Sequence, residues 1–242
     1  MDKKKICIFF LLCCILAFYV NAIVISESTV FDTLMRLIYY PTNIVLTILM
    51  IFLIPFAALS DVIDRYMMRF NKNIVLRIGI QAFHKQNIIE IIKNTIFWCM
   101  IFYFLAFLIV TIFVGPHFFK EYDARFNRVF ANEILNYLIF VIASCIGFCI
   151  NNVFLYICMY AFNNRYLIYI FPVIYIFFIN FISIILNRTC IRHKLLDCIT
   201  PLTMIYSFQV DLYPFISYFI TVALYFLIDY FGIKYLIKEK VM

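Results

Sequence analysis

The chain has 242 residues, of which 67% are hydrophobic and only 14% are charged, and its mean hydropathy is +1.02. Soluble domains carry about 25% charged residues, so this composition excludes an ordinary water-soluble domain. The net charge of +7 comes from basic residues spread over the polar connections, without a patch of aromatic residues that could read bases, so we expect no nucleic-acid partner.

Six long apolar stretches fill most of the chain. A helix needs roughly 20 apolar residues to cross a hydrocarbon layer about 30 Å thick, and each stretch has about that length. None alternates between polar and apolar residues, which favours helices over membrane β-strands. We therefore predict an all-α, polytopic membrane helix bundle that forms one domain over 1–242. The predicted spans are about 6–25, 42–60, 95–115, 134–161, 166–186 and 213–235.

The first stretch follows three lysines and ends near Val20-Asn21-Ala22, a pattern that also resembles a signal peptide with a cleavage site. We expect a retained helix, because the apolar character continues through Ile25. Cleavage after Ala22 is the alternative.

The distribution of Lys and Arg predicts the orientation. With six spans, 13 of the 20 basic residues fall on the side that holds both termini. Basic residues are enriched in cytoplasmic loops, so both termini are expected in the cytoplasm of a multi-pass protein of the plasma membrane.

The connection 61–94 is too short for an independent module and looks structured. Between Ile74 and Ile92, apolar and polar residues alternate at helical spacing, which predicts a two-faced helix lying along the membrane surface. Such a helix can offer one face to a soluble partner, or it can simply anchor the third span. Periodicity does not decide between these two interpretations.

Four polar residues stand out within the apolar stretches: Asn151, Asn152, Asn180 and Asp229. They could line a path for a substrate, but for the asparagines we favour hydrogen bonds between helices, worth about 1 kcal/mol each. Asp229 is near Lys234 and the end of its span, so we expect it to reach the interface and stay charged.

Seven of the nine cysteines fall in apolar stretches, where they act as small hydrophobic residues. Cys190 and Cys198 lie in a predicted outer loop near His193. The two cysteines could form a disulfide or stay free; with His193 they could also bind zinc, although these three ligands lack the usual spacing of a zinc site. We expect no metal site.

Enzyme motifs are missing from the sequence. None of the four glycines is followed by Lys, as a P-loop requires, and the three histidines lie scattered in predicted loops. We expect neither catalysis nor a cofactor, so any ATP hydrolysis would occur on another chain.

The order of these features resembles the membrane subunit, or permease, of bacterial ABC-2-type transporters. The local pattern Arg77-Ile78-Gly79-Ile80-Gln81-Ala82-Phe83 is similar to one in that family, where an Arg precedes a small residue and an aromatic one. The apolar segment 199–210 is too short to span a membrane, at about 18 Å of helix, and could be the short re-entrant helix found there.

The resemblance implies that the region 61–94 contacts a separate ATP-binding subunit, with Arg77, Gly79 and Phe83 at the contact. It also implies a homodimer or a pair with a sister permease, and export or clearance of an amphipathic peptide or lipid. Positive charge at Arg188, Arg192 and Lys194, on the predicted outer side, departs from the expected pattern.

Two alternatives remain. The chain could be a non-transporting immunity or assembly protein that binds a partner within the bilayer. It could also be a secondary transporter that uses Asp229.

Overall fold

The computed structural model describes residues 3–23, 30–38, 44–67, 71–115, 133–160 and 214–238, with residues 167, 170–171, 174–175 and 177–179 between the last two ranges. Within these ranges the chain is almost entirely helical and contains no strand, as predicted. The helices are α1 (Lys3–Ile23), α2 (Val30–Ile38), α3 (Ile44–Met67), α4 (Asn71–Ile78), α5 (Ile80–Val114), α6 (Glu133–Met159) and α9 (Pro214–Lys238).

Among the described residues, three helices are long and apolar enough to cross a membrane: Ile80–Val114, Ile134–Met159 and Tyr218–Lys238. They cover the predicted third, fourth and sixth spans. The apolar part of α1, Ile6–Asn21, is shorter. Helix α3 occupies the second predicted span and continues past its predicted end at residue 60 to Met67. Of the fifth predicted span, 166–186, only a few residues are described, and these are helical.

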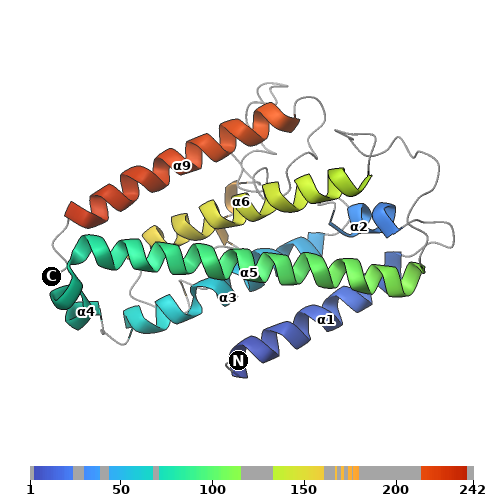
Figure 1. The fold of residues 1–242 in the computed structure, drawn as a ribbon, viewed down its shortest axis with the longest axis horizontal. Coiled ribbons are helices and arrows are strands. Elements are labelled where there is room, and N and C mark those ends of the chain that lie inside the picture. Colours follow the sequence, from blue (N-terminus) through green and yellow to red (C-terminus); the bar gives the residue numbers. More distant parts are fainter. Residues whose placement is uncertain are drawn as a thin grey trace.

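Helix α5 is the centre of the bundle and contacts each of the other named helices. It runs along almost the whole length of the molecule, with α1 and α3 to one side and α6 and α9 to the other (Figure 1). Its buried residues recur every three or four positions, the spacing that places side chains on one helix face. They include Ile91, Thr95, Trp98, Cys99, Phe102, Tyr103, Ala106 and Val110.

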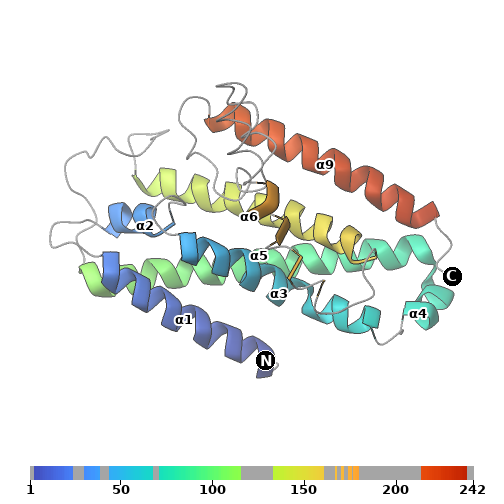
Figure 2. The ribbon, with the colours of Figure 1, turned by 180° about the vertical axis from the view of Figure 1, so that it is seen from behind.

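The helices differ in direction along the long axis (Figures 1 and 2). Helices α1 and α5 run one way, whereas α3, α6 and α9 run the other way, so the N-terminal end of α1 and the C-terminal end of α9 point in the same direction. The parallel course of α6 and α9 is the arrangement expected if one span separates them.

Helix α2 was not predicted from the sequence. It buries Val30, Phe31, Leu34 and Leu37 against the bundle, and the Phe31 ring meets the rings of Phe107 and Tyr137. This helix has only nine residues, whereas a membrane span needs about 20 apolar residues. The length criterion therefore left α2 within a connection between two predicted spans.

The region 61–94 differs from the single surface helix predicted over 74–92. A short helix, α4, ends at Ile78, and the rest of the predicted helix forms the first turns of α5 without a break before the membrane span. The two helices join at Gly79, whose φ of 83° and ψ of 156° belong to a region that only glycine enters readily. We call α4, Gly79 and the start of α5 the elbow.

The elbow predicts a specific response to Gly79→Ala. A Cβ at this backbone conformation costs about 1–3 kcal/mol, so the substitution should favour a continuous helix from α4 into α5. Spin labels at Leu76 and Lys93 should then separate toward the roughly 26 Å rise of 17 helical residues, measured by pulsed electron paramagnetic resonance. Gln81→Ala, at an exposed helical position, should leave the distance unchanged. An equal distance in the Gly79→Ala protein would contradict this account of the bend.

Candidate functional site: a buried polar seam beside an exposed elbow

Polar side chains pair along the interface between α5 and α6, deep in the bundle. We call these pairs the polar seam. They are Tyr103 with Ser144 (2.5 Å between hydroxyl oxygens), Cys99 with Cys145, Thr95 with Asn152 (2.8 Å), and His84 with Tyr156 (2.7 Å). Residue numbers fall along α5 as they rise along α6, so the pairs define one antiparallel register.

The seam is almost completely shielded. Thr95, Ser144, Asn152 and Tyr156 are each 0% exposed. A buried polar group without a hydrogen-bond partner costs roughly 1–3 kcal/mol, so sliding α5 along α6 would break several pairs at once. The seam therefore fixes how these two helices meet.

One end of the seam widens into a cluster around the Tyr156 hydroxyl. This oxygen lies 2.7 Å from His84 Nδ1, accepts a bond from Asn87 Nδ2 at 3.2 Å, and lies 3.2 Å from the Tyr160 hydroxyl. The ring of Tyr160 packs on Tyr66 of α3, with centroids 5.1 Å apart. We call His84, Asn87, Tyr156 and Tyr160 the Tyr156 cluster; it joins α5 to α6 just after the elbow.

An ion pair links the same part of α5 to α3. Arg65 Nη2 donates to Glu90 Oε2 at 2.6 Å, and the guanidinium also donates through Nε to the carbonyl oxygen of Asp61. Both side chains of the pair are more than a third exposed, so the pair adds little stability. Its geometric effect is to tie the end of α3 to the first turns of α5.

Sequence analysis missed the Tyr156 cluster. It placed His84 on the polar face of a surface helix in the connection 61–94, whereas this residue lies in α5 and is only 1% exposed. The available signal was the three-residue spacing of His84 and Asn87, which continues the buried face through Ile91 and Thr95. This buried face was not recognised because residues 61–94 were interpreted as a connection on the membrane surface.

Several buried polar atoms have no partner among the described residues: His84 Nε2, Asn152 Oδ1, Asp229 Oδ1 and both side-chain polar atoms of Asn151. Asn152 makes the kind of interhelical bond expected for it, whereas Asn151 makes none within the described ranges. Unsatisfied polar atoms in an apolar interior favour any rearrangement, ligand or water that supplies partners.

Asp229 differs from its expected position at the membrane interface. It is only 5% exposed and lies on α9 close enough to Cys158, Tyr175 and Tyr225 to interact with them electrostatically. The hydroxyls of Tyr175 and Tyr225 are hydrogen-bonded to each other. The carboxyl group therefore faces the bundle interior, although Lys234, on the next turns of α9, is exposed.

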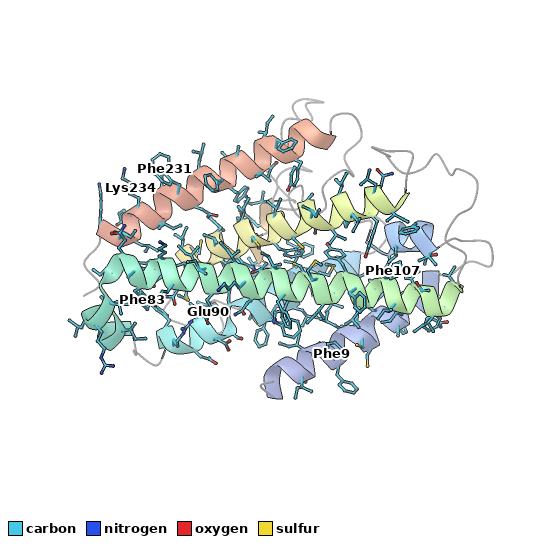
Figure 3. The ribbon with its side chains drawn as sticks, viewed as in Figure 1. Phe9, Phe83, Glu90, Phe107, Phe231 and Lys234 are labelled. Carbon is cyan, nitrogen blue, oxygen red and sulfur yellow. The ribbon has the colours of Figure 1, made fainter. Side chains whose placement is uncertain are left out.

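The three residues expected to contact an ATP-binding subunit occupy different environments. Arg77 is exposed at the end of α4, and Gly79 forms the bend itself. Phe83 is 4% exposed and packs beside His84 in the first turns of α5 (Figure 3). Leu76, which sequence analysis did not single out, is 84% exposed. The elbow therefore presents Leu76 and Arg77 outward and Phe83 inward.

Other expected features lie outside the described residues: Asn180, Cys190, Cys198, the loop with Arg188, Arg192 and Lys194, and the segment 199–210. Within the described ranges, no cluster of His, Cys, Asp and Glu could hold a metal ion. No protein-family model matches the chain, and neither a curated protein nor a solved structure matches it.

The hydroxyl of Tyr156 gives a direct test of the cluster. Tyr156→Phe leaves His84 Nδ1 and Asn87 Nδ2 without their partner, so the free energy of unfolding should fall by roughly 2–4 kcal/mol. Tyr160→Phe removes a hydroxyl whose hydrogen bond goes to Tyr156, and it should cost about 1 kcal/mol or less. Both values can be measured by reversible denaturation in detergent micelles. Equal losses in the two variants would contradict the central position of Tyr156.

Proposed function

We propose that this chain is the membrane subunit of a transporter powered by a separate ATP-binding subunit, similar to ABC-2-type permeases. The observation that carries the proposal is the elbow. Its short helix holds an exposed apolar side chain, Leu76, beside an exposed cation, Arg77, at one end of the bundle. Arginine is enriched at protein–protein interfaces, and a soluble partner could also cover the exposed leucine beside it.

The connections of the elbow support a mechanical role. Force on α4 would pass through Gly79 into α5, then to α6 through the Tyr156 cluster and to α3 through Arg65 and Glu90. ATP-driven movement of the partner would thereby shift the bundle between two packings. The partner must contact these packings with different affinity, since otherwise it cannot change their populations.

The full assembly follows from the same proposal. Six spans would cross the plasma membrane with both termini in the cytoplasm, and the elbow would face the ATP-binding subunit there. Two permease chains, identical or sister chains, would enclose the path for an amphipathic peptide or lipid. The exposed apolar side chains of α9, including Phe219, Phe226 and Phe231, suit either lipid or a second chain.

The contact can be tested with the double variant Leu76→Ala, Arg77→Glu. Both positions are exposed, so folding should be preserved while a stoichiometric soluble ATPase is lost from the complex purified in mild detergent. Lys234→Glu, a charge reversal at an exposed position of α9, is the matched control and should retain the ATPase. Phe83 is not suitable for this test, because truncating a buried ring would also disturb packing.

Two results would count against the proposal. If the double variant bound the ATPase as the unsubstituted chain does, the elbow would not be the contact. If the unsubstituted chain purified without any ATPase under several mild conditions, a non-transporting immunity or assembly protein would be the better assignment.

The position of Asp229 favours a second candidate function, a secondary transporter driven by an ion or proton gradient. A buried carboxyl group within a membrane helix is costly, and such groups commonly mark ion or proton pathways. Asp229→Asn keeps the size of the side chain but removes its charge. Under this second candidate it should abolish substrate transport into proteoliposomes, whereas an ATP-driven permease should keep most of its activity.

A further inference from the structure

A surface hollow of about 250 Å³ lies on the first turns of α5. We call it the α5 hollow; it is lined by Gln86, Ile89, Glu90, Lys93 and Asn94. Its walls thus offer two carboxamides, one carboxylate and one ammonium group around a single isoleucine. This surface is separate from the exposed residues of α4, and the inference below does not depend on the proposed function.

The position of the hollow along α5 sets its depth in a membrane. Lys93 is the last charged residue before the run 95–114, which contains no charged side chain. A helix of that length, about 20 residues, rises about 30 Å, the thickness of the hydrocarbon layer. The hollow therefore lies at the level of the lipid headgroups when this run spans the bilayer.

The same face of α5 continues as an exposed apolar surface. Phe97, Met100 and Phe104 follow Lys93 at intervals of four, three and four residues, which places them on one side of the helix. Their side chains are 54%, 54% and 61% exposed. A polar hollow at headgroup depth above an apolar stripe matches the shape of one phospholipid, with the headgroup in the hollow and an acyl chain along the stripe.

The charges of the hollow distinguish between headgroups. Glu90 accepts one bond from Arg65 at 2.6 Å, but a carboxylate has two oxygens with about four acceptor sites, so it can also accept from a ligand. Lys93 supplies a donor for a phosphate on the adjacent turn. The ion pair of Glu90 with Arg65 stands beside Lys93, so both signs of charge meet at the hollow, as a zwitterionic headgroup requires.

We propose that the α5 hollow binds the headgroup of phosphatidylethanolamine. Lys93 donates to the lipid phosphate, and Glu90 accepts from the primary ammonium group, while Gln86 and Asn94 offer further hydrogen bonds. Phosphatidylcholine has the same net charge, but its quaternary ammonium has no N–H to donate. The proposal therefore predicts selection between two lipids of equal net charge that differ in the amine, where one has N–H groups and the other has methyl groups.

The test uses the full chain, purified in detergent and supplemented with phosphatidylethanolamine, phosphatidylcholine or phosphatidylglycerol of the same acyl chains. Thermal unfolding is measured in each lipid, and native mass spectrometry identifies the lipids that stay bound. Phosphatidylethanolamine should raise the midpoint by about 2–4 °C more than phosphatidylcholine, because a ligand that binds the folded state stabilises it.

The variant Lys93→Ala should remove this difference and the bound phosphatidylethanolamine. Lys85→Ala, at an exposed position of the same helix outside the hollow, should keep both. Equal stabilisation by all three lipids, or retention of the preference in Lys93→Ala, would overturn the proposal. A stronger effect of phosphatidylglycerol would also overturn it, since this result would assign the hollow to anionic headgroups.

Discussion

The register between α5 and α6 is the constraint on which the rest of the structure depends. Inside a bilayer, lipid tails are as apolar as leucine, so the hydrophobic effect does not favour one register of two helices over another, and close packing and interhelical hydrogen bonds must supply that preference. The polar seam supplies that preference, because its pairs form together only when α5 and α6 are aligned as observed. Since α5 contacts each of the other named helices, fixing α5 against α6 also positions α1, α3 and α9.

The polar seam ends at the first turns of α5, where the elbow begins. The proposed partner contact on the elbow therefore lies next to the bonds that hold α5 against α6. The Tyr156 cluster follows Gly79 by less than three turns of helix, and the Arg65–Glu90 pair lies one to two turns further along. A change in the direction of α4 therefore acts on the part of α5 that is bonded to both α3 and α6. The unpartnered atoms of His84, Asn151 and Asn152 lie on these same helices, so a second packing could gain bonds that the present one lacks.

Composition and apolar length predicted the helical fold of the described residues and the three helices among them that are long and apolar enough to cross a membrane, because hydrocarbon thickness leaves few other solutions for such sequences. They did not predict α2 or the continuity of α5 with the region before it. Those features depend on packing partners distant in the sequence, such as Phe107 and Tyr137 for α2. Asn152 was expected to form a hydrogen bond between helices, but its partner Thr95 could not be predicted without knowing which helix faces meet. The same holds for the Tyr156 cluster. The inward orientation of Asp229 could not be predicted either, because it depends on the close packing of α9 against α6. At Gly232, one turn beyond Asp229, that packing is so close that a Cβ would lie about 3 Å from the side chain of Ile157 on α6.

The native cysteines allow the register to be measured directly. The thiols of Cys99 and Cys145 are neighbours across the seam, close enough to interact, and Cys149 lies one turn further along α6. Oxidative cross-linking of the unsubstituted chain in its own membrane, followed by digestion and mass spectrometry, should yield a Cys99–Cys145 disulfide as the main intramolecular product. A main product joining Cys99 to Cys149 or Cys158 would place α6 at least one turn away from the observed register and would contradict the account.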